Sequence, residues 1–93
     1  MNEEESNRQI AEQIRLAQQI EMLERIAKKK LTKEAIARYG NLKLAHPEIA
    51  INAITIIAQA EQLGQITETI DDNQFKALLK EIQQGKKQFK IKK

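Results

Sequence analysis

Residues 47–63 constrain the fold more than any other segment, because they are apolar over most of the surface of a helix. Five polar side chains recur at steps of four and three, which places them on one narrow stripe. They are Glu48, Asn52, Thr55, Gln59 and Gln62. The other faces carry Ile49, Ile51, Ala53, Ile54, Ile56, Ile57, Ala60 and Leu63. Such a helix lies at the centre of its domain, with other helices packed around it. Burying each isoleucine contributes about 1.5–3 kcal/mol, so this segment supplies much of the core.

The composition favours helices along the whole chain. Only three glycines and one proline occur in 93 residues, and no stretch alternates polar and apolar residues for long enough to form a sheet. A chain of this length forms one small domain, and without cysteine it depends on apolar packing for stability. We therefore expect an all-α fold with a compact three-helix bundle core over residues 31–85. An additional, partly mobile N-terminal helix is expected over residues 1–30, and a flexible basic C-terminal tail over residues 86–93.

Residues 6–30 contain no helix breaker and carry two apolar stripes. The later stripe consists of Leu16, Ile20, Leu23, Ala27 and Leu31. The earlier stripe, offset around the helix, consists of Ile10, Ile14 and Ala17. We expect the later stripe to pack on the core and the earlier part of the helix to be weakly held, in a monomer. A coiled-coil dimer through this helix is the alternative, although the apolar heptads drift.

The pair His46-Pro47 predicts a boundary between two core helices. Proline suits the first turn of a helix and biases the preceding residue away from helical dihedrals, so one helix ends near residue 45 and the next begins at Pro47. Thr32 can cap the earlier of these helices. Its inward side chains are expected to be Ala35, Ile36, Tyr39, Leu42 and Leu44. His46 is interpreted as a capping or turn residue rather than a catalytic base.

The last helix is expected over residues 72–84. Asp71 and Gln74 have the spacing of a capping box at its start, and Gly85 can end it. Gly64 ends the central helix in the same way. The apolar face of the last helix and its preceding connector is formed by Ile66, Ile70, Phe75, Leu78, Leu79 and Ile82.

Residues 31–82 resemble the programmed cell death protein 5 family, whose archaeal members are usually labelled DNA-binding proteins. The resemblance rests on LTKEAIARYGNLKLAHPEIA, GQI, FKALLKEI and the lysine-rich end FKIKK. Its most specific part is the spacing of Leu31, Ala35, Arg38, Asn41, Leu42, Leu44, Pro47, Glu48, Gly64 and Gln65. It implies a three-helix bundle with a more mobile N-terminal helix and a disordered basic C-terminus. Tyr39 and Ile36 depart from the family pattern, which usually has an aliphatic residue at the first position and a polar or basic one at the second. Both changes can alter the local charge pattern.

The sequence offers little support for catalysis. It has one histidine, one serine and no cysteine, and it has neither a glycine-rich phosphate loop nor the ligand spacing of a metal site. We expect a protein that is not an enzyme and needs no cofactor or metal. The first ten residues are acidic, unlike a signal peptide, and no apolar run reaches the length of a membrane span. A cytoplasmic location without membrane contact is expected.

Basic residues are concentrated in two segments. Residues 25–46 carry seven basic and one acidic side chain, and residues 86–93 carry five lysines and no acid. Such segments suit the phosphates of double-stranded DNA, since neutralising each phosphate releases condensed counterions. Lysines are flexible point charges, so contact without sequence preference is expected. The candidate DNA-binding residues are Arg25, Lys28, Lys29, Lys30, Lys33, Lys86, Lys87, Lys90, Lys92 and Lys93.

A protein-interaction adaptor is the alternative function. Eukaryotic members of the family that the chain resembles are linked to chaperonins and to nuclear regulatory proteins. A basic tail could dock on an acidic protein surface, with no physiological role for DNA. Both functions predict sensitivity to salt, so charge alone does not separate them.

Overall fold

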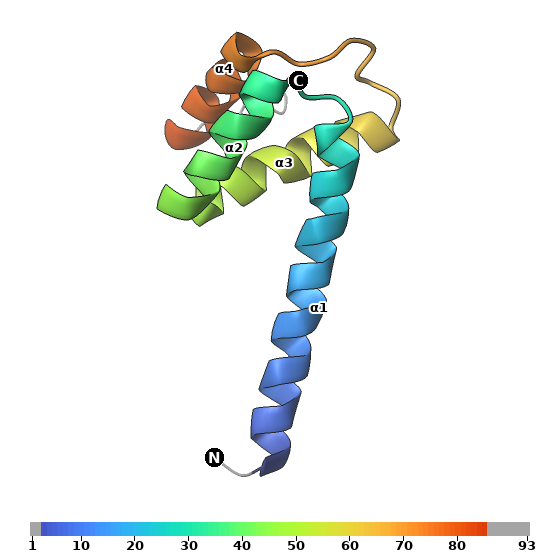
Figure 1. Ribbon diagram of the computed structural model, residues 1–93, viewed down its shortest axis with the longest axis vertical. Helices are drawn as coiled ribbons and strands as arrows, with labels where there is room; N and C mark the ends of the chain where they lie inside the picture. The colour runs from blue at the N-terminus through green and yellow to red at the C-terminus, as the bar shows by residue number, and fades with distance from the viewer. Residues whose placement is uncertain (1–2, 86–93) are drawn as a thin grey trace.

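The computed structural model describes residues 3–85 and confirms an all-α fold. These residues form four helices, α1 (Glu3–Lys28), α2 (Lys33–Ala45), α3 (Pro47–Gln62) and α4 (Asp72–Gln83). Figure 1 shows α2, α3 and α4 gathered at one end of the molecule, with most of α1 projecting away from them. The molecule is correspondingly elongated, with principal extents of 48 × 30 × 27 Å. The expected flexible tail over residues 86–93 lies outside the described residues.

Helix α3 is central, as its nearly continuous apolar surface predicted. It packs against each of the other three helices. Its buried residues are Ala50, Ala53, Ile54, Ile57 and Ala58. The expectation that Leu63 belongs to this core is wrong, because its side chain is 72% exposed. The helix ends at Gln62, and Gly64 takes a positive φ of 73° that turns the chain away.

The predicted helix boundaries are confirmed by their capping bonds. The Thr32 side chain accepts a hydrogen bond from the Ala35 backbone N–H. Asp71 and Gln74 form both bonds of the capping box, at 2.8 and 3.0 Å. His46 separates α2 from α3 through its backbone, which donates to the Leu42 carbonyl, while its side chain makes no capping bond.

The inward faces of α2 and α4 are largely as expected. Tyr39 and Ala35 on α2 and Phe75 and Leu79 on α4 are buried in the core. The expectation for Leu44 is wrong, because this side chain is 88% exposed. At about 100° per residue, Leu44 lies on the side of α2 opposite Ala35, so it points away from the bundle.

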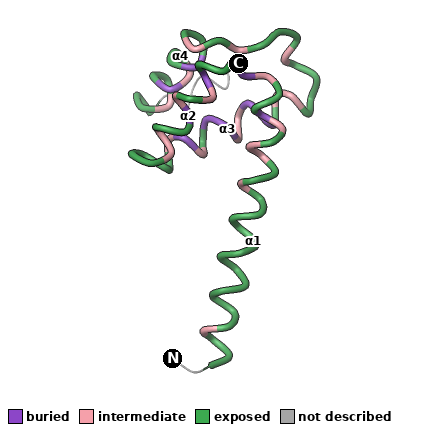
Figure 2. Tube along the Cα trace, viewed as in Figure 1, coloured by how far each residue is buried: buried purple, intermediate pink, exposed green. Residues whose placement is uncertain are grey.

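Helix α1 is one continuous helix that meets the bundle only at its C-terminal end. Ala27 is fully buried, and Ile20 and Leu23 pack partly buried against the core. Residues 3–19, which we term the arm, contain no buried residue (Figure 2). Leu16 was expected to face the core but is 57% exposed, because the bundle does not extend along α1 beyond Ile20. The mobility of this helix and its alternative role as a dimer seam stay predictions.

A short backbone contact joins the two loops of the bundle. The Thr32 N–H donates to the Ile70 carbonyl at 3.0 Å, and the Ile70 N–H donates to the Lys30 carbonyl at 2.7 Å. These bonds form an isolated parallel bridge between Leu31 and Ile70, and no strand extends from it within residues 3–85. Because α2 and α4 each begin just after the bridge, it holds their first turns close together.

Candidate nucleic-acid interface

The five predicted DNA-binding residues that the structure describes lie together where α1 passes into α2. We call them the junction cluster: Arg25, Lys28, Lys29, Lys30 and Lys33. Two of them occupy the last turn of α1, and their positive charge complements the negative end of the helix dipole. That interaction gives part of the cluster a structural role. The five tail lysines, Lys86, Lys87, Lys90, Lys92 and Lys93, lie outside the described residues.

The members of the junction cluster differ in how far their charge is already compensated. Lys30 lies 3.8 Å from the Glu61 carboxylate, and both side chains are only 28% exposed. Arg25, Lys29 and Lys33 are exposed, and none has a carboxylate within ion-pair distance among residues 3–85. The latter three side chains are therefore the ones available to an external anion.

A polar network between α1 and α2 engages Lys28 and Lys43. Tyr39 donates a hydrogen bond of 2.5 Å from its hydroxyl group to Glu24 Oε2, and Lys43 Nζ donates to the same oxygen. The ammonium groups of Lys28 and Lys43 lie 5.9 and 6.0 Å from the centre of the Tyr39 ring. Tyr39 is one of the two positions expected to depart from the family pattern, and here its buried ring lies close to two cations.

Opposing influences act on the two acidic groups of this network. Burial raises the pKa of the Glu24 carboxyl, but the hydrogen bonds from Lys43 and Tyr39 and the nearby positive charges outweigh it and lower the pKa below its ordinary value. Burial, followed by the hydrogen bond to Glu24, raises the pKa of the Tyr39 hydroxyl. The network therefore holds a carboxylate and a neutral phenol at neutral pH.

Arg38 is also held in an ion pair, because its guanidinium group binds the carboxylate of Asp72 in a bidentate manner. Its Nε and Nη2 atoms lie 2.6 and 2.9 Å from the two carboxylate oxygens. The hydrogen bond from Arg38 lowers the pKa of the Asp72 carboxyl, and the same bond raises the pKa of the guanidinium. This pair joins the first turn of α4 to the middle of α2 and neutralises both charges.

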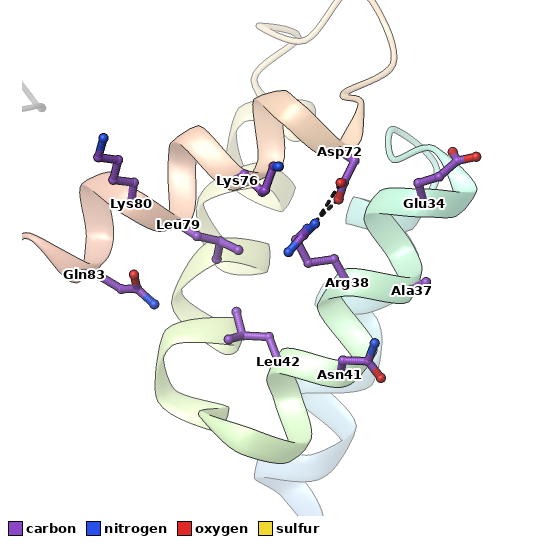
Figure 3. Close-up of a pocket in the computed structure, with 10 residues that line it drawn as sticks. All are labelled: Glu34, Ala37, Arg38, Asn41, Leu42, Asp72, Lys76, Leu79, Lys80 and Gln83. Atoms are coloured by element: carbon purple, nitrogen blue, oxygen red, sulfur yellow. Dashed lines mark hydrogen bonds and ion pairs between the residues drawn. The ribbon is translucent and has the colours of Figure 1, made fainter.

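An open groove of about 810 Å³ runs between α2 and α4 (Figure 3). Its apolar lining consists of Ala37, Leu42 and Leu79. Its polar lining consists of Glu34, Arg38, Asn41, Asp72, Lys76, Lys80 and Gln83. Lys76 and Lys80 are exposed and have no carboxylate within ion-pair distance in the described part of the chain. Sequence reasoning missed these two lysines, whose spacing of four residues on a predicted helix was the available signal.

Within residues 3–85, no group of three or more histidine, aspartate or glutamate side chains is placed to hold a metal ion. None of the helices over the same residues is both long enough and apolar enough to cross a membrane.

Comparison with known proteins shows the family of this chain. The family model described as "Double-stranded DNA-binding domain" matches residues 1–93, and the chain belongs to that family. This confirms the resemblance to the programmed cell death protein 5 family that residues 31–82 indicated.

The relatives are archaeal proteins with matching names. A "DNA-binding protein" of Thermococcus sibiricus is 41% identical over 90 residues, which are 95% of this chain and 80% of the relative. One from Thermococcus kodakarensis is 45% identical over 71 residues, or 75% of this chain and 63% of the relative. One from Pyrococcus horikoshii is 41% identical over 71 residues, or 75% and 62%. No solved structure matches this chain.

Proposed function

We propose that this protein binds double-stranded DNA without catalysing a reaction, through contacts of lysine and arginine side chains with phosphates. The observation that carries the proposal is the exposed set Arg25, Lys29 and Lys33, without ion pairs among residues 3–85, between the last turn of α1 and the start of α2 in a chain of this DNA-binding family. The tail lysines, which follow α4 in the sequence, add five further positive charges.

The chemistry of these side chains favours contact with the DNA backbone over reading of bases. A lysine ammonium group is a compact charge on a flexible stem, so it can reach phosphates in many geometries without fixing a base pattern. Four of the five residues of the junction cluster are lysines, as are all five charged residues of the tail. Binding should therefore be weak, independent of base sequence and steeply weakened by salt.

A salt series with full-length chains tests this function. Affinity for a fluorescent 20-base-pair duplex is measured for the wild type and for the double variant Lys29→Gln/Lys33→Gln. If both lysines contact phosphates, the slope of log affinity against log salt falls in magnitude by about 1.8, at 0.9 for each neutralised phosphate. The control is Arg8→Gln/Arg15→Gln, which removes two charges from the arm, one of them paired with Glu12 at 3.1 Å, and should leave the slope unchanged. Equal slopes in wild type and junction variant would refute the contribution of the cluster.

The protein-interaction adaptor remains the second candidate, and the arm is the observation that favours it. Ile10 and Ile14 are more than half exposed on the arm, which contains no buried residue, and exposed apolar residues of this kind suit a protein partner. An adaptor retains its protein partner in excess DNA, whereas a DNA-binding protein releases an acidic competitor when duplex is added. No binding of the wild type to duplex at low salt would favour the adaptor.

A further inference from the structure

We infer that the DNA-binding surface extends from the junction cluster onto α4, where Lys76 and Lys80 contact phosphates along the groove between α2 and α4. This inference rests on the proposed function, to which it adds two contact residues and the direction in which the bound DNA backbone runs. The direction runs from the α1–α2 turn, along the groove, to the end of α4 where the tail begins.

The placement of the two lysines supports an anion over this surface. Lys76 and Lys80 are four residues apart on α4, so they lie on one face with their Cβ atoms about 5–6 Å apart. Figure 3 shows both along the same side of the groove, projecting from α4. Asp72 attracts Lys76, but the two exposed ammonium groups at this spacing still repel one another, and a phosphate bound over both relieves that repulsion.

Of the two acids that line the groove, Asp72 is paired and only Glu34 has no ion pair among residues 3–85. The Asp72 carboxylate is neutralised by its two hydrogen bonds with Arg38. Glu34 lies near the Asp72 end of the groove, whereas Lys80 and Gln83 line the opposite end (Figure 3). The Gln83 amide adds a neutral donor beside Lys80. The cationic end of the groove is therefore the one from which the chain continues toward Lys86.

The other end of the groove meets the junction cluster. Lys33 and Glu34 are consecutive residues in the first turn of α2, the former in the cluster and the latter in the groove lining. The backbone bridge between Leu31 and Ile70 holds the start of α4 beside the start of α2. The two basic regions thus meet at the start of α2, where a DNA backbone running from Lys33 to Lys80 passes the Glu34 carboxylate.

An acidic protein segment is the competing occupant, because the groove also has apolar lining. Of the two possible occupants, an acidic protein segment and DNA, the charges of this surface favour DNA. Lys76 and Lys80 lie outside the buried apolar floor on an open face, and the sequence continues from the same end of α4 into five lysines with no acid. Phosphates of a duplex form a long row of charges, which suits cations at several separate positions better than a short acidic segment does.

The test measures duplex affinity across a salt series for full-length Lys76→Gln/Lys80→Gln. The wild type, Lys29→Gln/Lys33→Gln and the arm control Arg8→Gln/Arg15→Gln are measured beside it. The three double variants each remove two positive charges, so differences among them report position and not net charge. We expect the slope to fall in magnitude by about 1.8 in the α4 variant, with no change in the arm control.

Each remaining outcome identifies what fails. If the junction variant flattens the slope and the α4 variant does not, the proposed function stands and this inference is overturned. If the α4 variant and the arm control change equally, the effect is one of net charge and the inference is again overturned. If the wild type does not bind duplex at low salt, the proposed function itself fails. Circular dichroism spectra that match the wild type establish that each variant is folded.

Discussion

Replacing Tyr39 by phenylalanine removes one hydroxyl group from the buried contact between α1 and α2 and leaves the ring in place. That hydroxyl donates to Glu24, whose side chain is only 13% exposed. A hydrogen bond to a charged group contributes about 1.5–3 kcal/mol. Glu24 keeps its bond from Lys43 in the variant. We therefore expect a loss at the low end, about 1.5 kcal/mol, which corresponds to a fall in Tm of roughly 6–12 °C for a domain of this size.

The pH dependence of that loss tests its cause. The folded-state pKa of Glu24 is lowered from its ordinary value of 4.5. The stability that its charge contributes is therefore fully present above that ordinary value, and it is lost as the pH falls through the lowered folded value. The cost of Tyr39→Phe should be largest at neutral pH and should shrink in acid, as Glu24 becomes protonated.

Urea unfolding followed by circular dichroism measures both effects. Wild type, Tyr39→Phe, Glu24→Ala and the double variant form a thermodynamic cycle at neutral pH and again in acid. Once Glu24 is absent, removing the Tyr39 hydroxyl should cost little. If the phenylalanine variant loses the same stability with and without Glu24, the hydrogen bond is not the source of the loss, and our reasoning about this network is wrong.

Two further substitutions test the packing and capping of the bundle. Ile54→Ala removes a fully buried side chain from the central helix and should destabilise the protein by about 2–5 kcal/mol in urea unfolding; a loss below 1 kcal/mol would contradict the central position of α3. Asp71→Ala removes the side chain that accepts from the Gln74 backbone N–H and should cost about 1 kcal/mol by thermal melting. An unchanged Tm for Asp71→Ala would show that the start of α4 is held by other contacts.

The helix boundaries could be predicted because their signals are local. Pro47 cannot continue a helix from α2, and Asp71 and Gln74 satisfy each other's backbone groups within a single turn. The continuous apolar surface of residues 47–63 likewise required a central helix, whatever packed on it. None of these inferences needed the position of a distant residue.

The extent of the core could not be predicted in the same way. Periodicity placed Leu16 on the face that packs at Ile20 and Leu23, but it gave no measure of how far the bundle runs along α1. Leu63 has the same apolar character as its neighbours in α3, yet it falls just past the last helical residue. An apolar side chain is buried only where another element covers it, and that depends on tertiary geometry.

Which basic side chains of the candidate interface are free of ion pairs also could not be predicted, because it depends on contacts between residues far apart in the sequence. Arg38 and Asp72 are 34 residues apart in the sequence, and Glu24 and Tyr39 are 15 apart. A count of basic residues treats Arg38 and Lys43 like Lys29, although the first two are held in ion pairs. The groove between α2 and α4, which places Lys76 and Lys80 near α2, likewise could not be predicted without the fold.

In this protein, total helix content does not report cooperative unfolding alone, because the arm of α1 is helical but lies outside the bundle. The arm's backbone is helical, but none of its side chains is buried, so it is held against fraying by local contacts such as its backbone hydrogen bonds and the Arg15–Glu12 ion pair, and not by packing on the bundle. Its amide protons should exchange with solvent long before those of α3, which open only with the whole bundle. Heating should likewise reduce the helical signal gradually before the sharp transition. A probe of the buried Tyr39 ring will therefore report the unfolding of the bundle more faithfully than total helicity does.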